Sequence, residues 1–313
     1  MDPITHAVVG AAIAVLIGEP ASLSNPAFIS CISGAVIPDS DIIMQIKGHY
    51  KYLKSHRGIS HSIPMLFLYS GLITAALWLI FGGILSTKVF AYALIGCFSH
   101  ILLDITNSYG AKIFWPLYNK KITTDLLLIY DPMLIIMSII ILVPGLRVFI
   151  NPAFVILMFV SYLLLRYTMK LKAIQLIYHN LSGRYDIGAM RVLPSMVGFI
   201  RWHYIVMNEK EKIIGDVNIF PRHFRIIKRV ENLEQDLYDI VSKTPLAEFF
   251  SEFTPVFHIA CEKSEKGYTF NFTDLRYYMA KDFLHHATAV LNTDFKTIKS
   301  LFHPYSRSKN VEV

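Results

Sequence analysis

The sequence is poor in charge and in cysteine. Only 17% of its 313 residues are Asp, Glu, Lys or Arg, whereas roughly 25% is usual in soluble domains. The three cysteines, Cys31, Cys97 and Cys261, lie far apart, and two of them fall in apolar runs. Their spacing indicates neither a disulfide framework nor a thiolate metal site, and favours small core residues in a reducing compartment.

Two further absences concern the ends and the texture of the chain. A basic region at the N-terminus, which a cleavable signal peptide needs, is missing because Asp2 lies in its place. No low-complexity tract or internal repeat is visible. Net charge is +7, which would suit nucleic acid. In a membrane protein, however, the same excess indicates cytoplasmic loops rich in Lys and Arg, so no nucleic-acid partner is expected.

Long uncharged runs are what the sequence has in abundance, and nearly all of them precede Arg166. Hydrophobic residues make up 54% of the chain, and the run 62–87 contains 26 residues without a charge. A membrane-spanning helix needs roughly 20 apolar residues. The runs predict four strong spans, which cover 62–85, 89–103, 133–146 and 152–165.

Two shorter apolar segments precede these spans. Residues 4–17 and 27–37 are rich in Gly, Ala and Ser, which permit close approach of helices in a membrane. Both are shorter than a perpendicular span, so they predict a short helical hairpin, and whether they cross the membrane stays open. A soluble protein with buried helices is the alternative to the membrane interpretation.

The composition changes near residue 170. Alternating apolar residues in 199–207 and 213–220 predict one hairpin, and 256–261 with 268–272 predict a second. A helical pattern covers about 230–250. The chain therefore divides into a helical membrane domain, 1–169, and an α+β domain, 170–313. The predicted fold is an α-helical multi-pass membrane bundle with an appended C-terminal α+β domain.

Acidic residues and histidines of the membrane half gather at the ends of the predicted helices. His100 and Asp104 are four residues apart, hence on one face of a helix, so that one metal ion could bind both. An ionisable pair beside an apolar run is costly and usually functional. Two carboxylates follow a helix end at Asp39 and Asp41, and two imidazoles flank Arg57, at 56 and 61. His and Asp together suit zinc, manganese or iron.

Several of these residues also have a structural interpretation. Asp2 and Asp131, each before a proline, are good helix caps. A lone His6 near a terminus is often an interfacial side chain. Arg57 could be a cytoplasmic anchor, and Asn107 could belong to a turn.

Taken together, these residues resemble the YdjM/YfhP family of membrane-bound proteins grouped as metal-dependent hydrolases. The resemblance is carried by six blocks in order, and the polar tail extends it over most of the chain. The blocks are Met1-Asp2-Pro3-Ile4-Thr5-His6, Pro38-Asp39-Ser40-Asp41, His56-Arg57-Gly58-Ile59-Ser60-His61-Ser62, His100-Ile101-Leu102-Leu103-Asp104, Asn107-Ser108-Tyr109-Gly110 and Asp131-Pro132. The resemblance implies a multi-pass protein with a metal site.

A fainter likeness reaches the zinc-dependent phospholipase C and P1 nuclease group, which would imply phosphoester hydrolysis at zinc ions. That group uses a further His-x-x-x-Glu pair. The matching spacing here, His258 to Glu262, falls in a predicted strand, where positions four apart are too distant to share one ion. Asp125 and Asp131 could complete the ligand set instead.

On these grounds we expect metal-assisted hydrolysis of a phosphoester, which could be lipid-borne, with membrane lipids as surroundings and the oligomeric state left open. A bound divalent metal, zinc before manganese or iron and one ion or more, lowers the pKa of its water, so no Ser or Cys nucleophile is needed. The expected ligands are His6, Asp39, His56, His100 and Asp104. Asp41 and His61 are candidates for a second ion or for the general base, Arg57 for clamping an anion and Asn107 for orienting a ligand or the substrate.

The rival hypothesis is a non-enzymatic membrane protein that senses or carries a metal or docks a partner through its basic tail. Under either hypothesis, the Lys-rich segments predict the orientation in the membrane. The chain after Arg166 and the connections 47–57 and 104–131 carry most of the Lys and Arg. The positive-inside rule places them, the metal site and the C-terminal domain in the cytoplasm.

Overall fold

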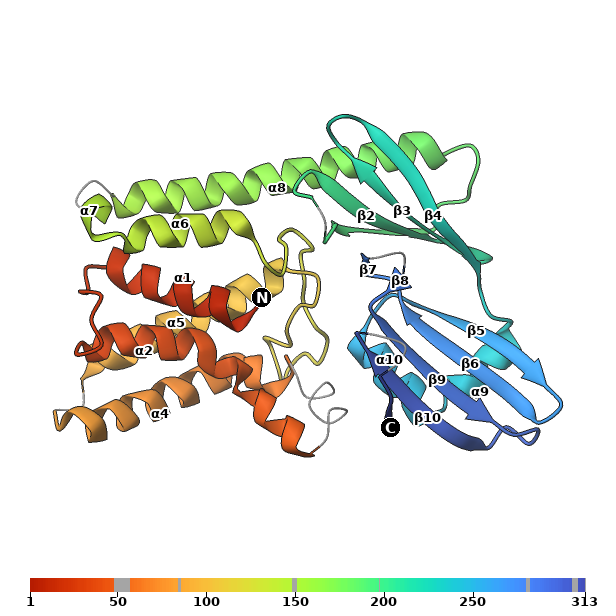
Figure 1. Cartoon of the computed structure of the whole chain (residues 1–313), viewed down its shortest axis with the longest axis horizontal. Helices are drawn as coiled ribbons and strands as arrows, with labels where there is room; N and C mark the ends of the chain where they lie inside the picture. The colour runs from red at the N-terminus through yellow and green to blue at the C-terminus, as the bar shows by residue number, and fades with distance from the viewer. Residues whose placement is uncertain are drawn as a thin grey trace. The chain divides into compact units, whose positions relative to one another are not determined.

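The computed structural model describes residues 1–47, 57–83, 86–147, 151–196, 198–279, 282–305 and 309–312. These residues form two compact units: the first covers 1–44 and 57–166, and the second covers the residues after Arg166 together with 45–47. The first unit is helical (Figure 1). It contains α1 (Pro3–Leu16), α2 (Pro26–Val36), the 3-10 segment η1 (Ile37–Lys47), the short 3-10 turn η2 (Ile59–His61), α4 (Ile63–Phe81), α5 (Thr87–Thr106), α6 (Pro132–Leu142), α7 (Pro144–Arg147) and the first half of α8 (Pro152–Leu181).

The helix starts follow from local sequence. Each of α1, α2 and α6 begins with a proline, after Asp2, Asn25 and Asp131 respectively, and each of these side chains accepts a backbone N–H of the first turn. Proline suits this position because its missing N–H would be unpaired there anyway, and the capping oxygen satisfies one of the free donors. The capping interpretation of Asp2 and Asp131 is therefore confirmed.

The predicted fold class is confirmed, with two changes in which helices are long enough to span. Four described helical segments have the length and apolar character of a span: Pro26–Ile43, Ile63–Phe81, Thr87–Thr106 and Pro152–Leu181. The prediction of a long span over 133–146 is wrong in length, because α6 has 11 residues and ends at Leu142. The residue before a proline avoids helical geometry, and Val143, before Pro144, is extended. Conversely, helical structure continues through Pro38, so α2 and η1 together reach spanning length.

The closest packing in the first unit joins α2 to α5. A Cβ at Gly96 would lie 2.1 Å from the Cys31 carbonyl oxygen, and one at Gly34 would lie 2.1 Å from that of Ala93. Only glycine permits backbones to approach so closely. These contacts hold the middle of α5 against α2.

The second unit contains two antiparallel sheets. The first has the order β1-β2-β3-β4, and consists of β1 (Ala189–Pro194), β2 (Arg201–Met207), β3 (Glu211–Asn218) and β4 (His223–Glu231). The second half of α8 packs on it, where Ala173 and Ile177 contact a core that includes Trp202 and Tyr204. The hairpin predicted from 199–207 and 213–220 corresponds to β2 and β3, and their register pairs Arg201 with Asn218.

The second sheet has the order β11-β10-β9-β6-β5. It contains β5 (Phe257–Ser264), β6 (Gly267–Asp274), β9 (His285–Leu291), β10 (Thr297–Pro304) and β11 (Val311–Glu312), with a small β7–β8 pair (Tyr278–Met279, Asp282–Phe283) alongside. Helices α9 (Gln235–Val241) and α10 (Pro245–Phe253) supply Val241, Phe249 and Phe250 to its core. Sequence patterns predicted β5, β6 and the helices, but not β9 to β11.

Candidate metal centre

Four side chains from separate segments of the first unit converge on one buried point. Asp39 comes from η1, His61 from η2, and His100 and Asp104 from the last two turns of α5. Each offers a ligand atom, and these atoms all lie within 4.8 Å of one another. We call these four residues the metal group. They are two imidazoles and two carboxylates, a donor set that binds zinc, manganese or iron.

His100 is fixed by a backbone carbonyl. Its Nδ1 lies 2.7 Å from the carbonyl oxygen of Ala35 in α2. Because a carbonyl only accepts, Nδ1 carries the hydrogen and Nε2 keeps its lone pair. That Nε2 lies 3.6 Å from Asp39 Oδ1 and 3.6 Å from Asp104 Oδ2. Metal-binding histidines usually donate their other ring N–H to a carbonyl or carboxylate in this way, which fixes the orientation of the ring.

His61 is fixed in the same way through a relay. Its Nδ1 lies 2.9 Å from Ser60 Oγ, and Ser60 donates in turn to Asp41 Oδ2 at 3.1 Å. Since the carboxylate takes the hydroxyl hydrogen, Ser60 Oγ accepts from the His61 Nδ1–H group. The remaining nitrogen, Nε2, faces Asp104 Oδ2 at 3.3 Å and Asp39 Oδ1 at 3.5 Å.

The Nε2 atoms of His61 and His100 face each other. His61 Nε2 and His100 Nε2 are 3.1 Å apart. Because both Nδ1 atoms carry hydrogen, either a proton or a cation must lie between these two nitrogens. Burial lowers the pKa of His61, but its hydrogen bonds to Asp104 and Asp39 and the charges of those carboxylates outweigh burial, so the pKa is raised. The surroundings of this nitrogen therefore favour a positive charge.

His6 lies directly against the metal group. Its ring stacks on that of His100 with centroids 3.7 Å apart and planes 19° apart. Its Nε2 lies 3.4 Å from Asp104 Oδ1. Neither ring nitrogen makes a hydrogen bond, although the side chain is fully buried. Buried imidazoles are rarely left in this condition, because an unmade hydrogen bond is costly.

Arg57 and Asn107 hold Asp104 from the other side. Arg57 Nε lies 3.2 Å from Asp104 Oδ2, and its Nη1 donates to Asn107 Oδ1 at 3.0 Å. Asn107, which follows α5, donates through Nδ2 to Asp104 Oδ1 at 3.1 Å. The amino group of Met1 also contacts Asp104, and the Met1 carbonyl accepts from Arg57 Nη2 at 3.3 Å. Arg57 has a positive φ of 59°, which is uncommon for an L-residue and marks a constrained site.

The residues present fit a metal ion. The Asp104 Oδ2 atom and both His6 nitrogens are buried and make no hydrogen bond. The lone pairs on His61 and His100 meet two carboxylate oxygens. So many lone pairs and negative charges at one buried point are costly in a folded protein unless a cation or protons balance them.

The structure places the residues expected from sequence as follows. His6, Asp39, His100 and Asp104 meet, and His61 lies in the same group. Asp41 contacts the metal group indirectly, because it binds Ser60, which in turn binds His61. His56 lies outside the described residues.

Two acidic residues considered as completing ligands lie elsewhere. Asp131 caps α6 and accepts from the Tyr162 hydroxyl at 2.9 and 2.8 Å. Asp125 lies beside Thr123, whose hydroxyl is 3.3 Å from its carboxylate. Neither belongs to the metal group.

Sequence reasoning missed three participants. Ser60 could have been found, because it sits between the two histidines of its motif and next to His61. The Ala35 carbonyl and the amino group of Met1 are backbone groups, so no residue type announces them. Their roles require the packing of α2 on α5 and of the chain start on α5, which sequence spacing does not give.

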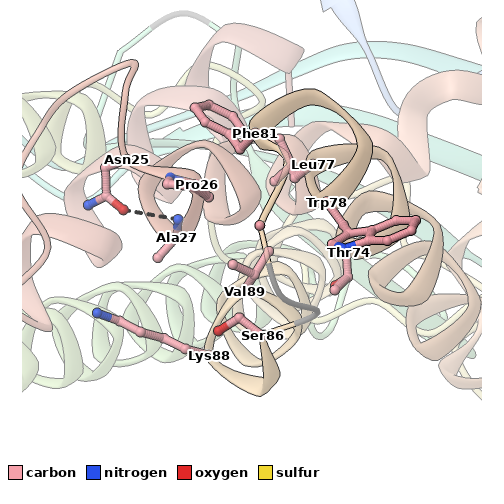
Figure 2. A pocket seen from close by; sticks show the side chains of 11 residues that line it. Asn25, Pro26, Ala27, Thr74, Leu77, Trp78, Phe81, Ser86, Lys88 and Val89 are labelled. Carbon is pink, nitrogen blue, oxygen red and sulfur yellow. Dashed lines mark hydrogen bonds between the residues drawn. The ribbon is translucent and has the colours of Figure 1, made fainter.

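A separate cavity of about 260 Å³ lies at the turn between α4 and α5 (Figure 2). Asn25, Trp78 and Lys88 line it, and Lys88 pairs with Glu19 at 2.7 Å. No member of the metal group lines this cavity. Asn25 caps α2 and donates to Glu19, and Lys88 pairs with Glu19, so these two polar groups support the local fold.

Comparisons with known proteins match two separate parts of the chain. A family model described as YdjM inner membrane protein matches residues 1–173, and one described as YfhP C-terminal alpha/beta plait domain matches residues 236–312. The uncharacterized protein YfhP of Bacillus subtilis (strain 168) is 26% identical over 289 residues, which cover 88% of this chain and 87% of that protein. No solved structure matches.

Proposed function

Because this chain belongs to the YdjM inner membrane protein family, we propose that it is a membrane-bound, metal-dependent hydrolase that cleaves a phosphoester. The observation that supports this proposal is the convergence of Asp39, His61, His100 and Asp104 within 4.8 Å at a buried point. When bound there, a divalent cation, zinc, manganese or iron, would lower the pKa of water and polarise a phosphoryl oxygen.

The protein groups have distinct tasks in this proposal. The metal group would hold the cation, with His6 as a further nitrogen donor against His100. Asn107 orients the Asp104 carboxylate, and Asp41 orients His61 through Ser60. These second contacts fix which nitrogen or oxygen faces the cation, and losing one typically costs about 10- to 100-fold in metal affinity or activity.

Arg57 is proposed as the positive group that faces the phosphoester. Its guanidinium lies at the edge of the metal group, on Asp104 and Asn107. A planar guanidinium binds phosphate oxygens through two parallel hydrogen bonds. The positive-inside rule supports a cytoplasmic position for this site and for the second unit.

The degree of burial supports a second candidate function. His61, His100 and Asp104 are fully buried, and the side chain of Asp39 is 11% exposed. Structural zinc sites are closed, whereas catalytic sites keep a position open for water or substrate. A metal sensor, a carrier or a scaffold that docks a partner would therefore also suit this geometry.

Activity measurements with purified protein separate the two functions. Wild type and His100→Ala would be purified in detergent, loaded with zinc, manganese or iron, and assayed for phosphate release from p-nitrophenyl phosphate, bis-p-nitrophenyl phosphate and phosphatidic acid. We expect metal-dependent hydrolysis by wild type and its loss in His100→Ala. A loaded wild-type protein that hydrolyses none of these with any metal would refute the hydrolase and leave the non-enzymatic metal protein.

A further inference from the structure

An apolar cavity of about 180 Å³ lies between α1, α5, α6 and α8 in the first unit. Apart from Ser99 and Ser138, its lining consists of aliphatic, Met and Phe side chains. Several of these, including Val9, Met137 and Phe159, are half-buried, so the cavity opens toward the outside of the bundle. Its walls belong to helices whose outward faces are apolar. A cavity with so few polar partners is a poor site for water.

Two helices, α1 and α5, carry both cavity-lining residues and residues of the metal group or its neighbour His6. On α1, His6 is followed at helical spacing by Val9, Ile13 and Leu16, all of which line the cavity. Residues three and four apart share one helix face. The face of α1 that contains His6 at its N-terminal end therefore lines the cavity farther along the helix.

On α5, too, cavity-lining residues lie next to residues of the metal group. Ser99 and Leu103 line the cavity, and each directly precedes a member of the metal group, His100 and Asp104. The cavity wall and the metal-binding face of α5 are thus neighbouring faces of the same two turns.

The other two helices also change from apolar to polar at that end. On α6 the lining residues Leu134, Ser138 and Ile141 follow the buried Asp131. On α8 the lining residues Val155 and Phe159 precede the buried residues Tyr162 and Arg166. These polar groups are joined, because Tyr162 donates to Asp131.

A chain of hydrogen bonds ties this polar end to the end of α5. Arg166 Nε donates to the Leu126 carbonyl at 3.0 Å, and Leu126 N donates to the Thr106 carbonyl at 2.9 Å. Thr106 is the last residue of α5, two positions beyond Asp104. All four walls are therefore apolar along the helices and polar at the end where the metal group lies.

We propose that this cavity binds the hydrocarbon chain of a membrane lipid whose phosphoester headgroup reaches the metal group, an inference that rests on the proposed function. An amphiphile has the same polarity profile as the cavity: an apolar length and a charged phosphate end. From Leu134 to Ile141 the wall rises by about 10 Å at 1.5 Å per residue, which accommodates part of a fatty chain. The chain is the substrate's anchor, and its burial orients the phosphoester at the metal group.

Photo-crosslinking tests the position of the chain directly. The full-length protein would be reconstituted in vesicles of phosphatidylethanolamine and phosphatidylglycerol with phosphatidic acid that carries a diazirine in the middle of one acyl chain. The substitution Val9→Trp fills the cavity. The matched control is Val160→Trp, at a 45% exposed position on α8 that does not line the cavity.

We expect cross-links at Met137 and Phe159 in the wild type, their loss in Val9→Trp and their retention in Val160→Trp. Metal content should be unchanged in both variants, because neither residue belongs to the metal group. Hydrolysis of long-chain phosphatidic acid should fall in Val9→Trp, while hydrolysis of bis-p-nitrophenyl phosphate should not. Labels confined to outward positions such as Leu157, and equal in all three proteins, would overturn the proposal.

The two proposals fail in different ways. Hydrolysis of soluble and long-chain phosphoesters alike, insensitive to Val9→Trp, would refute the lipid chain and leave the hydrolase. Cross-links that respond to Val9→Trp in a protein without phosphoesterase activity would refute the hydrolase and leave a lipid-binding metal protein.

Discussion

Asp104→Asn should release the metal while leaving the bundle folded. The substitution keeps the shape of the side chain and removes one negative charge at a fully buried position. Six groups lie around this carboxylate: Arg57 at 3.2 Å, His61 at 3.3 Å, His6 at 3.4 Å, Asn107 at 3.1 Å, His100 at 3.6 Å and the amino group of Met1. None of these neighbouring groups is a carboxylate, so none can replace the negative charge that the substitution removes.

The magnitude follows from the electrostatic attraction. Two unit charges about 4 Å apart attract by about 4 kcal/mol at an effective dielectric constant of about 20. Loss of the carboxylate charge also removes its desolvation cost, so we take about half of this attraction, about 2 kcal/mol, as the net loss, which is about 30-fold in Kd. A divalent cation carries two charges, so this value is a lower bound.

The same substitution has a cost in stability. The Arg57 guanidinium is buried beside Asp104, and breaking a buried ion pair typically costs about 3 to 5 kcal/mol. His100→Ala is the complementary variant, because it removes a metal ligand and keeps this ion pair. Asp131→Asn is the matched control: it neutralises another fully buried carboxylate of the bundle, outside the metal group.

The assay is metal content per folded protein, measured by mass spectrometry of the element after size-exclusion chromatography, with Tm measured in parallel. We expect Asp104→Asn and His100→Ala to lose the metal and Asp131→Asn to keep it. Folded Asp104→Asn and His100→Ala with the wild-type metal content would show that the site lies elsewhere. Equal loss in Asp131→Asn would show that the loss reports damage to the bundle.

Four further predictions concern the membrane, the orientation, the second unit and the helix packing. The intact chain should stay in the membrane pellet after high-salt and carbonate washing, because α4 and α5 are long apolar helices; release would refute integral insertion. In intact cells with Cys261→Ser, an impermeant thiol reagent should label Ser86→Cys and spare Ser55→Cys, and the reverse pattern would place the site outside the cytoplasm. Burial lowers the pKa of His285 from 6.5 to about 4, so the unfolded chain binds a proton more readily in that interval. The contribution of His285 to the free energy of unfolding of the second unit should be constant above pH 6.5 and fall by about 3 kcal/mol as pH drops to about 4, and His258, whose pKa is also lowered to about 4, adds to the fall over the same interval. Hydrogen exchange of β9 peptides measures this, and His285→Gln should reduce the slope of the free energy against pH; an unchanged slope would contradict the assignment. Gly96→Leu should lower Tm, by the equivalent of about 3 kcal/mol or more, because its Cβ would meet backbone of α2; an unchanged Tm would contradict the close approach.

Local signals explain which parts of the fold the sequence predicted. Asp2, Asn25 and Asp131, each before a proline, mark helix starts by a mechanism that acts within four residues. The α6 span was predicted too long because an apolar run continues through Val143 and Pro144, whereas the backbone before a proline leaves the helix. Strand β9 was missed because its sequence begins with two adjacent histidines and ends with adjacent apolar residues, so apolar and polar residues alternate only briefly, although burial alternates over 287–291.

Local sequence signals also predicted only part of the candidate site. His100 and Asp104 could be placed on one face of a helix from their spacing alone. Their meeting with Asp39 and His61 depends on long-range packing, which the order of motifs indicates without defining its distances. The carbonyl of Ala35 has no sequence signal, because every residue carries one.

The close approach of α2 and α5 at Gly34 and Gly96 has a consequence for ion selectivity. Asp39 follows α2, His100 and Asp104 belong to α5, and the Ala35 carbonyl of α2 holds the His100 ring. The separation of these donors is therefore set by contact of two backbones, which cannot relax by side-chain rotation. A larger ion such as calcium, which takes six to eight oxygens at 2.3–2.6 Å, would require the two helices to move apart. We therefore expect the stiffness of this helix pair, as well as the chemistry of the ligands, to decide which metal the group holds.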